Sequence, residues 1–338
     1  SSVATVAAIG PTAILEMRRY GYSTEVAAGV VGAAGTLGVL IPPSIALVLF
    51  AIISGESIGL MLIAGIVPGI ISAVIYAAVI YWRAQRRPDL FGLVALDYTV
   101  EQVRRESGST TDLQIGFGRA LSTIIRVTII FAAVIGGMYA GIFTVVEAAA
   151  IGALIALIYF IADIIADRLS PWIAFRKAIL ETVSLSSMTF GLLLGGAVLT
   201  YFLVMAQIPN QITQWVIAQD LPPLLIVVLI LLMFIPMGMF LDPISMLLIG
   251  IPLTYPIVTE LGYDGIWFGI LVVKLIEVGL VTPPFGLNAF VVAGAANDVS
   301  VEQAFRGILW FVPIDLLTIA LFFVFPGIIM WLPNMANL

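Results

Sequence analysis

Residues 35–44 read Gly-Thr-Leu-Gly-Val-Leu-Ile-Pro-Pro-Ser and place a proline pair inside an apolar stretch that runs from 24 to 53. Residues 282–288 read Thr-Pro-Pro-Phe-Gly-Leu-Asn and repeat this arrangement inside a second apolar stretch. Proline lacks a backbone N–H and its ring clashes with the preceding turn, so each pair breaks a helix and frees carbonyl groups. The two stretches therefore predict two broken helices at membrane depth, packed against protein or a wet cavity.

The composition around these breaks is that of an integral membrane protein. The chain is 62% hydrophobic and only 10% charged, whereas soluble domains are about a quarter charged. Apolar windows such as 58–82 and 306–331 exceed the roughly 20 residues that cross a bilayer. These features predict an all-α, polytopic helix bundle in a lipid bilayer.

Two absent residue types narrow the function. The sequence has no Cys and no His, so disulfides, thiolate nucleophiles and the commonest general base are excluded. This leaves few enzyme mechanisms, and we expect no organic cofactor. The basic residues are scattered at predicted helix ends, which argues against binding to nucleic acid.

Apolar length and helix breakers predict the order of the spans. The broken helices run over 24–53 and 264–296, and two half-length helices precede the second one, forming a re-entrant hairpin. The expected elements are a half-span at 3–17, spans at 58–82, 119–141, 144–167 and 180–206, hairpin arms at 222–240 and 243–258, and a last span at 307–331.

The placement of Lys and Arg predicts the topology, because short cytoplasmic loops carry the excess of both. The basic connection 84–118 is expected in the cytoplasm, with one short amphipathic helix near Val100 to Arg105, and the segment 207–221, which has no Lys or Arg, on the far side. The expected parts are a first repeat (1–53), a connecting helix (54–83), a cytoplasmic linker (84–118), scaffold-like helices (119–206), a second repeat (207–296) and a C-terminal helix (297–338).

An internal repeat links the two broken helices. Four pairs recur at an offset of 240 or 241 residues: Ile9-Gly10 with Ile249-Gly250, Gly21-Tyr22 with Gly262-Tyr263, Gly29 with Gly269, and Pro42-Pro43 with Pro283-Pro284. Five predicted crossings lie between the copies, and an odd number inverts the second copy. Inverted repeats with broken helices place substrate and coupling ions near the membrane midplane.

The repeat predicts two Na⁺ sites, because freed carbonyls and hydroxyls are hard oxygen ligands and each hairpin turn carries side-chain oxygens. Asp242 is the only acidic residue at such a turn, and an N-cap role for it is compatible with ion binding. The first site is expected at Ser2, Thr5, Gly35, Thr36 and Pro42, and the second at Gly238, Asp242, Thr282 and Gly286.

A small organic anion is expected between the two breaks, where half-helix N-termini offer unpaired donors. The expected substrate-binding residues are Pro43, Ser44, Pro284 and Asn288. Asn288 is the sharpest candidate because its amide can donate to a carboxylate, and its alternative role is to tie the broken helix to a neighbour. Lys274 and Glu277, three residues apart on one predicted helix, are expected to pair with each other.

Several motifs resemble the large membrane subunit of tripartite ATP-independent periplasmic (TRAP) transporters. The residues that carry the resemblance are Ser1 to Thr5, Gly35 to Ser44, Ala64 to Gly69, Gly141 to Thr144 with Glu147 to Ala150, Gly238 to Pro243, and Thr282 to Asn288. The family's opening helices and first hairpin arm have no counterpart in the sequence, which leaves the first ion site in doubt.

The resemblance implies a Na⁺-driven importer of a small organic acid, such as a dicarboxylate or sialic acid, in a bacterial or archaeal cytoplasmic membrane. It also implies an elevator-like movement of 1–53 and 222–296 and two partners, a periplasmic substrate-binding protein and a small membrane subunit. The sequence does not identify the acid. The alternatives are an integral membrane enzyme, which would need a convergent catalytic site, and a channel, which would need a continuous polar lining.

Overall fold

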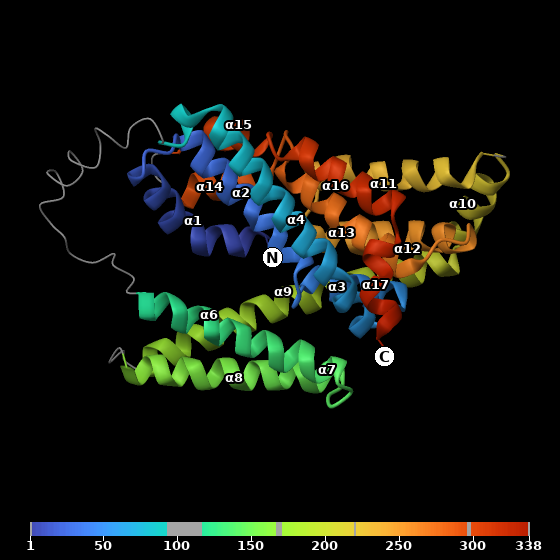
Figure 1. Ribbon diagram of the computed structural model, residues 1–338. Helices are drawn as coiled ribbons and strands as arrows, with labels where there is room; N and C mark the ends of the chain where they lie inside the picture. The colour runs from blue at the N-terminus through green and yellow to red at the C-terminus, as the bar shows by residue number, and fades with distance from the viewer. Residues whose placement is uncertain (1, 93–116, 167–170, 220, 296–298, 337–338) are drawn as a thin grey trace, which may run out of the picture. The chain divides into compact units, whose positions relative to one another are not determined.

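The computed structural model describes residues 2–92, 117–166, 171–219, 221–295 and 299–336, and in these ranges every regular element is a helix (Figure 1). The described elements fall into two compact units. The first unit holds α1 (Ser2–Arg19), α2 (Thr24–Leu40), α3 (Ile45–Ser54), α4 (Ile58–Arg86), η1 (Pro88–Leu90), α10 (Ile208–Ile217), α11 (Pro223–Phe240), α12 (Pro243–Glu260), α13 (Gly265–Val281), α14 (Leu287–Ala295), α15 (Val301–Ile308), α16 (Val312–Val324) and α17 (Gly327–Met335).

The second unit is a smaller group of long, apolar helices. In it, α6 packs against both α8 and the π-helical turn η2. Arg126 on α6 pairs with Asp163 on α8 at 2.6 Å, which compensates the charge of each. The unit holds α6 (Phe117–Phe131), η2 (Ala132–Gly136), α7 (Gly137–Tyr139), α8 (Val145–Ala166) and α9 (Pro171–Met205).

The helices confirm a multi-pass, all-α membrane fold. Six stretches of the described chain are long and apolar enough to cross a bilayer, and a seventh appears if the bent pair α2 and α3 is one span. The six are Ile58–Arg86, Val146–Ile165, Pro171–Met205, Pro223–Phe240, Pro243–Glu260 and Val301–Val324.

Three predictions about the helices differ from the structure. The arms α11 and α12 have 18 residues each and are not half-length; at 1.5 Å per residue each is about 27 Å long, close to the thickness of a bilayer core. A helix, α10, occupies the segment that was predicted only as a far-side connection. The last predicted span, 307–331, begins at the end of α15 and is divided between α16 and α17, with Pro313 in the first turn of α16 and Pro326 just before α17.

The two broken helices have corresponding boundaries. Gly21 and Gly262, which follow α1 and α12, both adopt left-handed backbone conformations, with φ of +83° and +85°. Ser23 caps α2 by accepting a hydrogen bond from Val26, and Asp264 caps α13 in the same way. These boundaries match at an offset of 241, so the matches at 240 (Ile9-Gly10 and Gly29) fall one residue out of that register.

The packing of the two broken helices is also matched. Under the 241-residue offset α1 corresponds to α12, α2 to α13 and α3 to α14. Helix α1 packs against α2 and α14, and α12 packs against the corresponding α13 and α3. The contacts of α2 with α14 and of α13 with α3 form another corresponding pair, and α2 meets α13 directly. The two broken helices therefore form one interlocked group within the first unit.

The connection between α4 and the next described helix begins against the turn that joins α1 to α2. Ser23 N–H donates to the Leu90 carbonyl at 2.9 Å, and the rings of Tyr22 and Phe91 meet edge to face at 5.5 Å. The predicted amphipathic helix near residues 100–105 lies outside the described residues. The cytoplasmic placement of the connection stays a prediction.

A glycine contact joins α2 to α15 and provides a test of the packing. A Cβ at Gly307 would lie 1.9 Å from the Glu25 carbonyl oxygen and 2.8 Å from Gly29 Cα. Both neighbours are backbone atoms, so the helices must move apart. We expect Gly307→Ala to destabilise the protein by about 1–3 kcal/mol, measured as a lower thermal unfolding midpoint by tryptophan fluorescence.

The matched control for this prediction is Gly294→Ala on α14, because a Cβ there meets no atom within 4 Å. It should leave the unfolding midpoint close to that of the wild type. Equal midpoints for the two alanine variants would show that α2 and α15 do not pack as closely as described.

Candidate functional site

The first break lies between α2 and α3, which are bent by 41°. Pro42 and Ser44 are buried there, whereas Pro43 is exposed. The Ser44 hydroxyl accepts a hydrogen bond from Leu47 N–H at 3.3 Å, so it serves as the N-cap of α3. The exposed proline and the buried cap place the start of α3 at the edge of the first unit's core.

The second break lies between α13 and α14. The Thr282 hydroxyl donates to the Val278 carbonyl at 2.6 Å, and Gly286 adopts a left-handed φ of +43°. A Cβ at Gly286 would lie 2.2 Å from the Phe305 ring and 3.4 Å from the Thr282 carbonyl oxygen, so only glycine fits without movement. Pro284 is exposed, while Asn288 in the first turn of α14 is fully buried.

Most residues of the first predicted cation site meet where α1 packs against α2. Ser2 is buried; a Cβ at Gly35 would lie 2.3 Å from a methyl group of Val6 and 3.2 Å from the Ser2 carbonyl oxygen. Thr5 Oγ1 would lie 3.0 Å from a Cβ at Gly38. Hydroxyl and carbonyl oxygens therefore line this contact, and glycines allow the two helices to approach. These are ligands that suit a hard cation.

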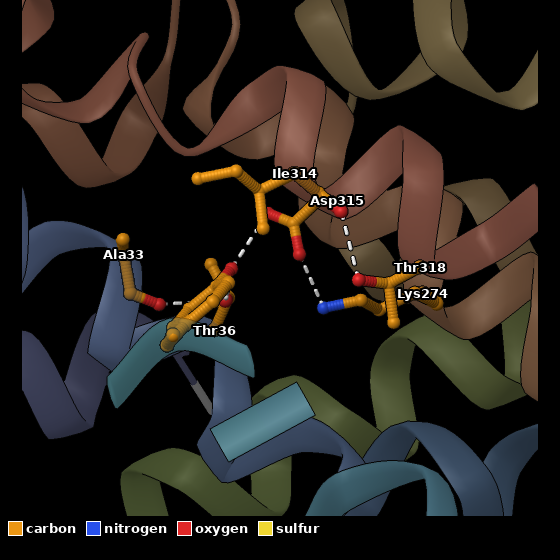
Figure 2. A network of polar contacts seen from close by, with 7 residues as sticks. Ala33, Thr36, Lys274, Ile314, Asp315 and Thr318 are labelled. Atoms are coloured by element: carbon orange, nitrogen blue, oxygen red, sulfur yellow. Dashed lines mark hydrogen bonds and ion pairs between the residues drawn. The ribbon is translucent and has the colours of Figure 1, made fainter. Parts of the chain in front are cut away.

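Thr36 of the same predicted site points elsewhere. Its hydroxyl donates to the Ala33 carbonyl at 2.7 Å and lies 3.4 Å from the Tyr76 hydroxyl (Figure 2). The Thr36 hydroxyl is therefore turned away from α1, and only the backbone of Thr36 can contribute an oxygen to the predicted site. Pro42 lies in the break, one turn beyond this contact, and its burial agrees with a place in the protein interior.

The second predicted site is only partly assembled. Gly238 packs against α13. A Cβ added at this position would lie 2.8 Å from Gly279 Cα and 3.2 Å from the Ile276 carbonyl oxygen. The rings of Phe240 and Phe285 meet at 5.7 Å and bring the hairpin turn to the second break. The site therefore has backbone oxygens and Thr282 on one side and the hairpin turn on the other.

Asp242 has the N-cap role that the sequence allowed. One carboxylate oxygen accepts hydrogen bonds from Ile244 N–H at 3.0 Å and Ser245 N–H at 3.1 Å, and the other accepts from the Ser245 hydroxyl at 2.5 Å. A carboxylate offers about four lone pairs. Three are engaged, so Asp242 has room for one further contact to a cation.

The structure overturns the predicted pair between Lys274 and Glu277. The Lys274 ammonium lies 2.5 Å from Asp315 Oδ1, and this pair is almost completely buried between α13 and α16 (Figure 2). Asp315 Oδ2 accepts a hydrogen bond from the Tyr76 hydroxyl at 2.6 Å. The spacing rule failed because a counter-ion from another helix lies closer to the ammonium than the carboxylate one turn away.

Three other buried polar side chains have no hydrogen-bond partner among the described residues. They are Glu277 on α13, Ser72 on α4 and Asn288 on α14, and both polar atoms of Glu277 and of Asn288 are unsatisfied. Buried polar groups are nearly always paired, so each such group points to a ligand, an ion or a water. For Asn288, the alternative role of tying α14 to a neighbouring helix has no support in these contacts.

The comparison with known proteins identifies the family of the chain. Residues 1–328 match the family described as "Tripartite ATP-independent periplasmic transporter, DctM component". The chain belongs to the DctM family of TRAP transporter permeases. The resemblance drawn from the two proline breaks and the hairpin turn is thereby confirmed over almost the whole sequence.

Individual relatives differ in the substrate that their names give. The chain is 34% identical to the C4-dicarboxylate TRAP transporter large permease protein DctM of Pseudomonas aeruginosa, over 99% of this chain and 73% of the relative. It is 28% identical to the sialic acid permease protein SiaM of Vibrio cholerae, over 99% and 74%. It is 26% identical to the 2,3-diketo-L-gulonate permease protein YiaN of Escherichia coli, over 97% and 72%.

Proposed function

We propose that this protein is the large membrane subunit of a Na⁺-coupled secondary transporter that imports a small organic acid across the cytoplasmic membrane of a bacterium or archaeon. The observation that carries the proposal is the interlocked pair of broken helices with an unsatisfied, buried Asn288 at the start of α14. Its DctM-family membership favours transport over the enzyme and channel alternatives.

The matched packing supports an inverted repeat. Exchanging α1 with α12, α2 with α13 and α3 with α14 reproduces the same set of contacts, as a two-fold relation between the two halves requires. The predicted topology makes the second half inverted. A cation and an anion bound between such halves can face either side of the membrane in turn, when the halves move together.

The movement that we propose is of the elevator type. The moving part is residues 1–53 and 222–296, which hold both breaks and the hairpin, and the fixed part includes the helices of 119–206. Asn288, a buried polar side chain without a partner among the described residues, lies at the second break, where the cargo would bind. Helices α8 and α9 expose mainly apolar side chains suited to lipid or to a membrane partner.

Both predicted cation sites offer oxygen atoms that suit Na⁺. The contact between α1 and α2 brings oxygens of Ser2 and Thr5 towards Gly35 and Gly38. At the second site the Asp242 carboxylate has one lone pair that its capping bonds do not use. The Thr282 hydroxyl donates its hydrogen to Val278, so the lone pairs of its oxygen can bind a cation. In both sites Na⁺ would bring together groups from two helices and so couple cation binding to the arrangement of the halves.

The organic acid is proposed to bind at the starts of α3 and α14, near Ser44 and Asn288 with the backbone at Pro43 and Pro284. Helix N-termini attract anions through their free N–H groups and dipole. The relatives' names cover C4-dicarboxylates, sialic acid and 2,3-diketo-L-gulonate, which carry a carboxylate, and isethionate, which carries a sulfonate. We therefore propose that this chain recognises the anionic acid group, while a periplasmic binding protein selects the acid and a small membrane subunit completes the transporter.

The test is uptake into proteoliposomes that contain the permease with its small subunit and binding protein. A Na⁺ gradient should drive accumulation of the delivered acid, and replacement of Na⁺ by K⁺ should abolish it. Accumulation that is independent of any cation gradient would refute the coupling, and turnover of the substrate into another compound would favour the enzyme alternative.

Two substitutions at the second cation site should act alike. Asp242→Ala and Thr282→Ala each remove one oxygen ligand, so each should raise the half-saturating Na⁺ concentration for uptake by about threefold to tenfold. The control is Thr259→Ala, whose hydroxyl bonds within α12 at the helix end. A wild-type Na⁺ response in both ligand variants would remove the second site.

A further inference from the structure

Glu277 is a buried charge that the cation sites above do not use. It lies on α13 with about 1% of its surface exposed. Among the described residues no side chain forms an ion pair or a well-formed hydrogen bond with its carboxylate, although the Ser2 hydroxyl lies beside it. An ionised carboxylate in this position is costly unless it is paired. Either a bound proton or a bound cation therefore neutralises it.

Lys274 is not that partner. Its ammonium is held by Asp315 at 2.5 Å, and Asp315 is also fixed by the Tyr76 hydroxyl at 2.6 Å. The charges of Lys274 and Asp315 cancel within this network, which Figure 2 shows reaching from α13 to α16. One negative charge, that of Glu277, remains in the cluster.

The groups around Glu277 come from several helices. Ser2 on α1 lies beside the carboxylate, and Lys274 and Asp315 lie within electrostatic range. Tyr76 on α4 is also within electrostatic range, but its hydroxyl is held by Asp315. Lys274 and Asp315 are paired and Tyr76 is a donor to Asp315, so Ser2 is the neighbour that can contribute further oxygen ligands.

Ser2 connects Glu277 to the first cation site. Its carbonyl oxygen approaches Gly35 on α2, so the same residue lies between α2 and the carboxylate on α13. Thr36, next to Gly35, holds on α2 the position that Glu277 holds on α13 under the 241-residue offset. The carboxylate therefore lies at the place where the two broken helices and α1 meet.

We propose that the Glu277 carboxylate is the anionic ligand of the first cation site and binds, with oxygens of Ser2, one monovalent cation of the Na⁺ type. One positive charge balances the one uncompensated negative charge, and carboxylate, hydroxyl and carbonyl oxygens are hard ligands. This inference rests on the proposed Na⁺ coupling. It adds the residue that ties the cation to α13, so that binding links α1 and α2 to the second half.

The experiment measures Na⁺ binding through stability, without uptake. The full chain in lipid nanodiscs is titrated with NaCl at constant ionic strength, with choline chloride as the replacement, and the thermal unfolding midpoint is recorded. A cation that binds only the folded protein raises this midpoint. We expect Glu277→Gln to raise the half-saturating Na⁺ concentration at least fivefold, and the control Glu302→Gln, on the exposed end of α15, to leave it unchanged.

The outcomes separate this proposal from the general coupling. A wild-type response that Glu277→Gln leaves unchanged overturns the role of Glu277 and keeps Na⁺ coupling. A wild-type protein that does not respond to Na⁺ overturns both. Stabilisation of the wild type by acidification in place of Na⁺, lost in Glu277→Gln, would mean that the carboxylate carries a proton, and it also overturns the proposal.

A second variant decides the matter if Glu277→Gln does not fold. Ser2→Ala keeps the carboxylate and removes only one hydroxyl. A rise of at least twofold in the half-saturating Na⁺ concentration supports the shared site. An unchanged value in a folded Ser2→Ala protein overturns it.

Discussion

Lys274→Met is expected to destabilise the protein by about 3–5 kcal/mol, because it leaves buried carboxylates without their cation. Asp315 would keep the hydrogen bond from Tyr76 but lose the ammonium at 2.5 Å. Glu277, which has no ion pair with a described side chain, would then share the interior with a second carboxylate that has lost its counter-ion. The measurement is the free energy of unfolding in mixed micelles titrated with SDS.

The reverse substitution should cost less. In Asp315→Asn the ammonium of Lys274 loses its counter-ion, but Glu277 lies one turn away on the same helix and can receive it. Asparagine also keeps an oxygen that accepts from the Tyr76 hydroxyl. We therefore expect Asp315→Asn to lose less than half as much stability as Lys274→Met.

A double variant separates the value of the pair from the cost of breaking it. Replacing both members of a buried ion pair by apolar groups is often close to neutral. Lys274→Met combined with Asp315→Leu should therefore recover most of the lost stability, apart from the hydrogen bond of Tyr76. If Lys274→Met alone is as stable as the wild type, the ion pair does not exist in the membrane.

Apolar length and proline position predicted most of this fold because both act locally. The helix breaks at Pro42-Pro43 and Pro283-Pro284, the hairpin turn at Asp242 and the start of α4 follow from missing donors, capping residues and span lengths. The division of the last span was missed although Pro313 and Pro326 were in view. Hydropathy averaged over a window hardly changes at a single proline, but a proline interrupts the hydrogen bonds of the helix backbone at that point.

The charge network could not be predicted from spacing. Lys274 and Asp315 are 41 residues apart, and Tyr76 joins them from 239 residues away. The spacing of charges along one helix considers only Glu277, one turn from Lys274, and therefore predicted the wrong pair. A usable signal was present, because Asp315 is an acidic residue within the last apolar stretch, and such residues face the bundle interior and need a partner.

Asn288→Leu is expected to reduce the initial rate of uptake by about 10-fold to 100-fold, which corresponds to one lost hydrogen bond to a charged group. Asn288 is fully buried and both ends of its amide lack a partner within the described residues. It lies in the first turn of α14, and the N-terminus of a helix attracts anions through its dipole and its first N–H groups. A carboxylate of the substrate would satisfy the amide donor.

Leucine is a suitable replacement because the corresponding residue of the first half, 241 positions earlier, is Leu47, which is also fully buried. The control is Asn210→Leu on α10, where the same change is made at an exposed asparagine. Uptake is measured in proteoliposomes with the small subunit and binding protein. The Na⁺ dependence of the unfolding midpoint should stay within twofold of the wild type in both variants.

The stability of Asn288→Leu distinguishes a ligand from a structural role. An unpaired buried amide costs about 1–3 kcal/mol of stability. An amide whose partner is the substrate therefore lowers the stability of the substrate-free protein. Its replacement by leucine should leave the unfolding midpoint unchanged or raise it while uptake falls. If Asn288 instead tied α14 to a neighbouring helix, uptake and stability would fall together, and an unchanged uptake rate would remove the residue from the binding site.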